Sequence, residues 1–277
     1  MRFLIISLFV VLLPFSAMSQ RFKSQFEIGV MGGGSYYIGD LNPNKHFVYS
    51  KPAFGAIVRY NMTTRWSWRF TATYGNVHGA DSQSDDPFQL NRNLSFKSHI
   101  LELAAGVEID LFKYRINDMK YPISPYFFYE IAYFNMNPQG EYLGNPVDLQ
   151  PLGTEGQGTA LSDKNRYNLH QLSIPLGIGV KFNLAKRVAI SVEYGIRKTF
   201  TDFLDDVSGN YVDHDQLRAL NGPLAAELAD PSLSGIGSSP AGLNRGNSAN
   251  KDWYSFYGVM LTFKPFKRNI CDMRGWR

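Results

Sequence analysis

The sequence predicts an all-β fold, namely an eight-stranded antiparallel transmembrane outer-membrane β-barrel with long extracellular loops. Three observations lead to this class. The chain opens with an export signal, eight segments of alternating polarity follow, and the connections between them alternate between long and short. A water-soluble β-sandwich also has alternating segments, but it gives no reason for loop lengths to alternate, so the barrel is favoured.

The first segment has the composition of a secretory signal. Met1 and Arg2 precede an apolar run over residues 3–15, and small residues follow just before Gln20. No cysteine stands at the cleavage position, which disfavours a lipoprotein. Beyond Gln20 no stretch is long and apolar enough to span a bilayer as a helix. We therefore divide the chain into a signal peptide (1–19), a barrel (20–263) and a periplasmic C-terminal tail (264–277).

The hairpin over residues 54–75 shows the pattern most clearly. Two alternating runs flank the turn at 61–65, and successive side chains of a strand point to opposite faces. In the second run, Trp66, Trp68 and Phe70 share one face, whereas Arg69 belongs to the other. One face is thus large and aromatic and the other small, polar and charged, as in a membrane barrel with a polar lumen.

The remaining strands follow from the same alternation. We expect them at residues 26–39, 101–111, 124–134, 171–182, 188–197 and 253–263. Pro175 lies inside one of these runs and predicts a bulge or a locally broken ladder.

The connections fall into two length classes. Long polar loops are expected at 40–51, 76–97, 135–168 and 202–251, and shorter connections at 61–65, 112–122 and 183–187. Bacterial outer-membrane barrels have long external loops and short periplasmic turns. Within the longest loop, residues 216–228 are compatible with short helical turns that Gly222-Pro223 would interrupt.

Charges of both signs occur on the faces assigned to the lumen. These are Arg59, Arg69, Glu102, Glu108, Glu130, Lys181, Glu193 and Arg197. An eight-stranded barrel is only wide enough for side chains to fill it, and charges removed from water need partners. We therefore predict a salt-bridged plug in preference to an ion or proton path.

Three tryptophans stand near predicted strand ends. Trp66 and Trp68 follow a short turn, and Trp253 opens the last strand beside a long loop. These positions fit the aromatic girdles at the two membrane interfaces, with ordinary packing as the alternative.

Neither a catalytic site nor a cofactor or metal site is predicted. No His-x-x-x-His pair occurs, and His170 and Ser173 differ in parity, so they should project to opposite faces of one strand. Asp205-Asp206 and Asp213-His214-Asp215 match no calcium-loop pattern and are interpreted as solvated loop charge. The net charge of +4 is modest and the basic residues are scattered, so we expect no nucleic-acid partner. We also expect no small-molecule substrate.

Several motifs resemble a known family. Gly32–Leu41 reads GGGSYYIGDL, residues 91–96 read NRNLSF, residues 101–108 read LELAAGVE, and Leu261-Thr262-Phe263 precedes a cysteine. These resemble the PorG-type outer-membrane barrels of the type IX secretion system of Bacteroidetes. The resemblance implies a non-enzymatic secretion component that associates with the periplasmic ring of PorK and PorN, with a link to gliding motility in some species.

The last strand is followed by a tail that contains the only cysteine, Cys271. With eight strands both termini lie on the periplasmic side, so the tail is expected to dock on a periplasmic partner. Cys271 is a candidate for an intermolecular disulfide, with an unpaired thiol as the alternative. Two other functions stay open: an adhesion or recognition barrel that uses the long loops, and an enzyme that acts on outer-membrane lipid.

Overall fold

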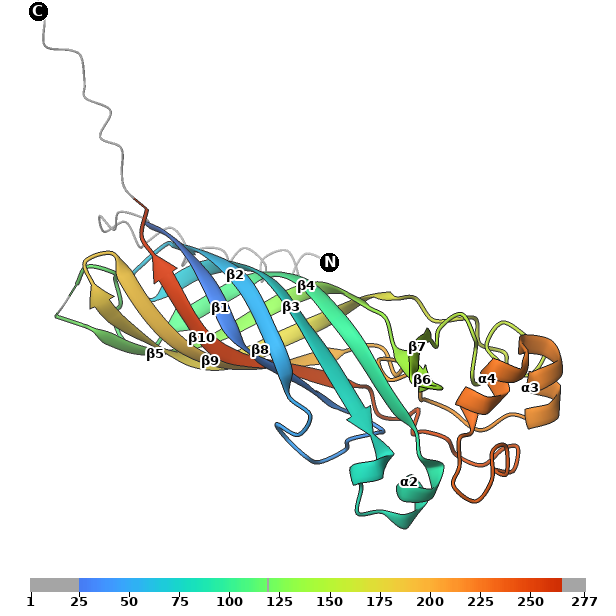
Figure 1. Cartoon of the computed structure of the whole chain (residues 1–277). Coiled ribbons are helices and arrows are strands. Elements are labelled where there is room, and N and C mark those ends of the chain that lie inside the picture. Colours follow the sequence, from blue (N-terminus) through green and yellow to red (C-terminus); the bar gives the residue numbers. More distant parts are fainter. Residues whose placement is uncertain (1–24, 119, 266–277) are drawn as a thin grey trace, which may run out of the picture.

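The computed structural model describes residues 25–118 and 120–265 (Figure 1). The predicted signal peptide, most of the predicted tail and Cys271 lie outside the described residues. The barrel strands are β1 (Gln25–Ile38), β2 (Lys51–Asn61), β3 (Trp66–Ala80), β4 (Ser95–Asp110), β5 (Ile123–Met136), β8 (His170–Ala185), β9 (Val188–Thr199) and β10 (Trp253–Phe263).

Within the described residues these eight strands close into a barrel. Each is antiparallel to its neighbours, in the order β3-β2-β1-β10-β9-β8-β5-β4, and pairing of β3 with β4 completes the ring. The first strand pairs with the last, so that Gly33 lies opposite Gly258. The predicted fold class is confirmed.

The two faces of the barrel wall have opposite polarity. On β1, Phe26, Ile28 and Val30 are each more than half exposed, while Glu27 between them is buried. The other barrel strands repeat the pattern, which places an apolar band outside and polar groups inside. This is the reverse of a water-soluble sandwich and is the arrangement that hydrocarbon around the barrel requires.

The connections alternate as predicted, although several strands run further than predicted. β3 extends to Ala80 and β4 begins at Ser95, so both ends of the expected loop 76–97 belong to strands. Beyond the apolar band both faces of a strand can be polar, so the alternation that marks the membrane-spanning part fades. The start of β1 and the end of β10 lie at the same end as the turn at 62–65.

Pro175 breaks the ladder locally, as expected. The pairing of β5 with β8 passes from Tyr129–Leu176 to Ala132–Ser173 without a shift of register, and the two positions between them are not paired. The absence of a proline N–H explains the gap.

The long loops form an ordered cap at one end of the barrel (Figure 1). Its elements are the 3₁₀ turn η2 (Asp81–Gln83), α2 (Pro87–Arg92), the hairpin β6 (Gln139–Tyr142) and β7 (Asn145–Asp148), α3 (His214–Asn221) and α4 (Pro223–Ala229). The two last helices are separated by Gly222, whose φ of 91° ends α3, as the sequence indicated. No helix among the described residues has the length and apolar character needed to cross a bilayer.

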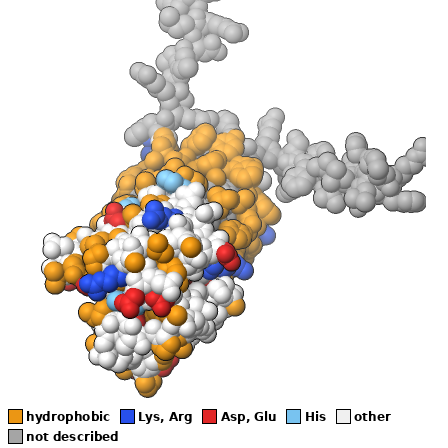
Figure 2. Space-filling model, turned by 90° about the vertical axis from the view of Figure 1, so that its right-hand side faces the viewer, with side chains coloured by type: hydrophobic (Ala, Val, Ile, Leu, Met, Phe, Trp, Pro, Cys, Tyr) orange, Lys and Arg blue, Asp and Glu red, His pale blue; other side chains and the backbone are white. Residues whose placement is uncertain are grey.

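One hydrophobic core joins the cap to the barrel. Tyr37, Phe96 and Tyr254 fill the mouth of the barrel, and Leu204 and Val207 of the loop between β9 and β10 pack against the same cluster. The cap is therefore part of the folded body. Figure 2 shows this end in front, with mixed polar and apolar side chains, and the mainly hydrophobic barrel wall behind it.

Candidate functional site

The eight charged residues predicted for the lumen all lie inside the barrel and are buried. Their side chains come from β2, β3, β4, β5, β8 and β9, because each occupies the inward parity of its strand. The structure brings most of them into one network, centred on Glu108 and Arg69.

Glu108 is shared by three cations. The Arg59 Nε donates to Glu108 Oε2 at 2.9 Å and the Arg69 Nη1 donates to the same oxygen at 3.1 Å. Lys181 contacts the other carboxylate oxygen and also donates to Asp110 at 3.0 Å. One carboxylate thus neutralises charge from three strands.

Arg69 is the second centre. Its Nη1 and Nη2 donate to the two carboxylate oxygens of Glu193 at 2.9 and 3.1 Å. Its Nε lies 3.2 Å from Glu130, and its guanidinium stacks over the Phe128 ring at 3.9 Å. A fully buried guanidinium is therefore paired with two carboxylates along its edges and with an aromatic ring on one face.

A second ion pair lies nearer the cap. Arg197 Nε is 3.3 Å from Glu102, which also accepts a hydrogen bond from the Tyr254 hydroxyl at 2.7 Å. The Arg197 guanidinium also donates to the Gly195 carbonyl and lies 4.8 Å from the Phe256 ring. The two groups of charges fill the interior along the barrel axis.

Sequence reasoning missed two members of the lumen network. Glu27 accepts from Asn61 at 2.6 Å and lies 3.9 Å from Arg59, and Asp110 pairs with Lys181. Both have the inward parity of their strands, so the alternation that located the others also marked these two.

The cap contains its own buried ion pairs. Arg92 holds Asp81 through two hydrogen bonds of 2.7 and 2.6 Å. Arg245 donates to Glu155 at 3.0 Å and to the Asp206 carbonyl at 2.6 Å. These contacts tie together loops that are far apart in the sequence.

The interpretation of Asp205-Asp206 as solvated charge was wrong. Both side chains are buried, and Asp206 accepts hydrogen bonds from Thr154 at 2.5 Å and Tyr167 at 2.6 Å. Burial raises the pKa of Asp206 to about 6, although nearby Arg245 opposes the shift. The Tyr37 hydroxyl contacts Asp205 at 2.5 Å and Asp252 at 3.1 Å, and burial raises the pKa of both carboxyls.

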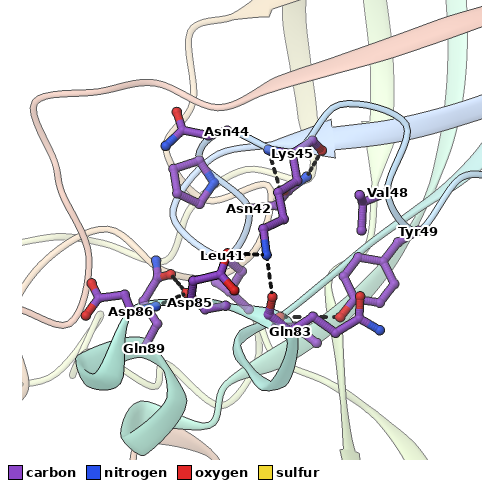
Figure 3. Close-up of a pocket in the computed structure, with 13 residues that line it drawn as sticks. Leu41, Asn42, Asn44, Lys45, Val48, Tyr49, Gln83, Asp85, Asp86 and Gln89 are labelled. Carbon is purple, nitrogen blue, oxygen red and sulfur yellow. Dashed lines mark hydrogen bonds and ion pairs between the residues drawn. The ribbon is translucent and has the colours of Figure 1, made fainter.

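An external pocket of about 320 Å³ lies between the loop 39–50 and η2 (Figure 3). Lys45 crosses it and binds Asp85 and the Gln83 carbonyl, each at 2.8 Å. Within this loop, Phe47 and Tyr49 adopt φ of 62° and 57°, a left-handed conformation that is strained for aromatic residues. The pocket is open to the surface, and polar side chains such as Asn42 and Gln89 share its lining with apolar ones such as Leu41 and Val48.

The three predicted interface tryptophans lie at the two ends of the barrel. Trp66 and Trp68 are each 45% exposed beside the short turn, and Trp253 begins β10 at the cap end. His170 is exposed while Ser173 is fully buried and bonded to Tyr254, so the structure does not bring that pair together.

The fold and its interior define a class of protein: a narrow transmembrane barrel whose lumen is closed by ion pairs and one of whose two mouths is covered by an ordered cap. A family model described as a domain of unknown function, DUF6089, matches residues 3–226, so the chain belongs to that family. No curated relative matches the chain.

Solved structures with similar folds are eight to eleven per cent identical to this chain. Ail of Yersinia pestis, in complex with the heparin analogue sucrose octasulfate, shares 11% identity over 88% of this chain and 100% of its own, with a TM-score of 0.42. Neisserial surface protein A shares 8% over 88% and 100%, with a TM-score of 0.43. OprG of Pseudomonas aeruginosa shares 11% over 88% and 98%, with a TM-score of 0.39.

Proposed function

We propose that the protein is a non-enzymatic outer-membrane component of the type IX protein secretion system, where it anchors the periplasmic ring of PorK and PorN. The closed lumen is the observation that supports this role most strongly. Arg69, Glu108 and Glu193 occupy the axis of the barrel with their charges paired, so no bore remains for solute or cargo. A barrel that offers no passage through its lumen functions by binding other molecules at its surface.

The short-turn end offers a mainly basic surface. Exposed basic side chains stand there on three connections, whereas Asp118 is the one acidic residue of those connections among the described positions. The exposed basic residues are Arg65, Lys113, Lys120, Lys186 and Arg187. In the proposed orientation this end faces the periplasm, and its charge favours a partner with an acidic surface.

The resemblance to PorG-type barrels supplies the identity of that partner. The motif Gly32–Leu41 that carries this resemblance lies in β1, one of the two strands that close the barrel, and in the loop that follows it. The tail with Cys271 would begin at the same basic end, since β10 ends at Phe263 beside the short turns.

The test is a crosslinked pull-down from solubilised outer membranes of cells that carry the secretion system. We expect the wild type to recover PorK and PorN, and the variant Lys113→Glu/Lys120→Glu/Lys186→Glu to recover at least about tenfold less. The matched control Lys51→Glu/Lys97→Glu changes the same residue type at the cap end and should recover the ring normally. Absence of both ring proteins from the wild-type sample would refute the proposal.

The disulfide part has a separate test. Non-reducing gels of the wild type and Cys271→Ser should differ by one crosslinked band. A single monomer band in both samples would show that anchoring, if present, is non-covalent.

Recognition of an external ligand is a second candidate function, which the pocket in Figure 3 favours. Substitution of Asn44, which lines this pocket, by Trp would fill it without touching the basic end. If recognition is the function, Asn44→Trp abolishes cell attachment and leaves secretion unchanged, whereas the secretion role predicts that neither process responds.

A further inference from the structure

A second external cavity, of about 470 Å³, lies at the rim where the cap meets the barrel wall. Its walls come from three separate segments: the end of the loop before β8, the residues after β9 and the residues before β10. Lys164 and Lys251 both line it, together with the hydroxyl-bearing residues Thr201, Ser208 and Ser248. The cavity thus gathers ammonium and hydroxyl donors from distant parts of the chain.

The charge of this cavity is mainly positive. Lys164 and Lys251 are exposed, and Asp202 is the one carboxylate among the lining residues. Asp202 already accepts a hydrogen bond from the Ser208 hydroxyl at 2.6 Å. Lys251 Nζ donates to the Ser248 carbonyl at 3.2 Å, and its charge also interacts with the Asp202 carboxylate, so the exposed ammonium faces the cavity with part of its donors engaged.

On the barrel side the cavity is lined by Gln171 of β8 and by Phe200, which continues the outward-facing parity of β9. Phe200, which lines the cavity, follows β9 and is 58% exposed. Beside it Lys198 lies opposite Trp253 in the pairing of β9 with β10, and its Nζ is 5.7 Å from the indole ring. Lysines and aromatic residues in this arrangement are typical of the interface between hydrocarbon and headgroups.

We propose that this cavity binds the phosphate group of a phosphorylated glycolipid in the outer leaflet. The ammonium groups of Lys164 and Lys251 and the neighbouring hydroxyls hold the phosphate, and the acyl chains run along Phe200 and the outer wall. A phosphate next to two ammonium groups is favoured electrostatically, and the apolar wall distinguishes a lipid from a soluble anion. This site does not depend on the proposed role in secretion, but its place in the outer leaflet rests on the proposed orientation, in which the cap end faces outward.

The probe is diphosphoryl lipid A, mixed into phosphatidylcholine nanodiscs that hold the full chain and measured by native mass spectrometry after release into detergent. We expect the wild type to retain lipid A, and Lys164→Gln/Lys251→Gln to retain about tenfold less. The control Lys51→Gln/Lys97→Gln removes two exposed lysines from β2 and β4, which flank β3 on the opposite wall, and should behave as the wild type.

Two further arms separate the sources of the phosphate. Lipid A without its phosphates should not be retained, and inorganic phosphate at millimolar concentration should not displace bound lipid A. Equal retention by both lysine pairs, or retention of dephosphorylated lipid A, overturns the proposal. Displacement by inorganic phosphate alone assigns the site to a free anion and overturns its lipid part. Heat-modifiable gel mobility confirms that each variant is folded.

Discussion

Arg59 and Arg69 face each other directly across the pairing of β2 with β3, on the inward side of the barrel. Like charges in directly opposed positions destabilise a sheet. Here Glu108, from the next strand, accepts a hydrogen bond from each guanidinium. The carboxylate converts a repulsive pair into a three-residue bridge, and its loss should have large effects.

Replacement of Glu108 by Gln should strongly destabilise the barrel. The substitution keeps the shape but leaves Arg59, Arg69 and Lys181 without a shared counter-charge, which for a broken buried pair costs about 3–5 kcal/mol. Urea unfolding in detergent micelles, followed by gel mobility, measures the change. Glu141→Gln, at an exposed position of β6, should shift the midpoint little, and an equally small shift for Glu108→Gln would contradict the bridge.

The glycines of the Gly32-Gly33-Gly34 run should not be equivalent. A Cβ at Gly33 would lie 1.9 Å from the Tyr257 carbonyl oxygen, whereas a Cβ at Gly32 would meet no atom within 4 Å. Gly33→Ala should therefore prevent closure of β1 onto β10, while Gly32→Ala should assemble normally. Heat-modifiable mobility in outer-membrane fractions compares the two, and equal assembly of both variants would disprove the close approach.

The cap should become less stable as the pH rises. The pKa of Asp206 is about 6 in the folded protein against an ordinary 3.8, so the folded cap binds the proton more tightly than the unfolded loop does. The contribution of protonated Asp206 to the stability of the cap is complete below about pH 4 and is lost as the pH rises through about 6. The groups that face it are Arg245, Glu155, Thr154 and Tyr167.

Hydrogen exchange checks this dependence. Protection factors of the amides of Val207 and Ser208, corrected for the intrinsic effect of pH, should fall between pH 4 and pH 7. In the variant Asp206→Asn, the part of this fall in protection that comes from titration of Asp206 should be absent. Protection that rises over this range would contradict the raised pKa.

The barrel should not conduct ions. Its interior is filled by paired side chains, and a water-filled path would need several of them to move together. Planar lipid bilayers that contain the purified protein should show no stepwise currents, with a porin in the same bilayer as the positive control. Regular current steps from the wild type would rule out a closed lumen.

The alternation of polar and apolar residues along the strands was sufficient to predict which charged side chains point into the lumen, but not which of them form ion pairs with one another. Arg69 and Glu193 lie 124 residues apart, and they meet across the lumen because closure of the ring puts β3 and β9 on opposite walls, which no local pattern reveals. The cap was less predictable, because its order depends on irregular contacts such as those of Arg245. The β6–β7 hairpin turns at Leu143-Gly144, a weak turn signal within a Gly-rich and Asn-rich stretch.

The pairing of Gly33 with Gly258 has a consequence for biogenesis. In every other neighbouring pair of barrel strands, the two strands follow one another along the chain, with only the β6–β7 hairpin inserted between β5 and β8. The seam between β1 and β10 instead joins segments that are separated by most of the polypeptide. Long-range pairing of this kind forms slowly, because the ends must meet before it yields any stabilisation. The ring can therefore close only after the final strand has been delivered to the membrane, and until then both edges of the unfinished sheet require protection by assembly factors.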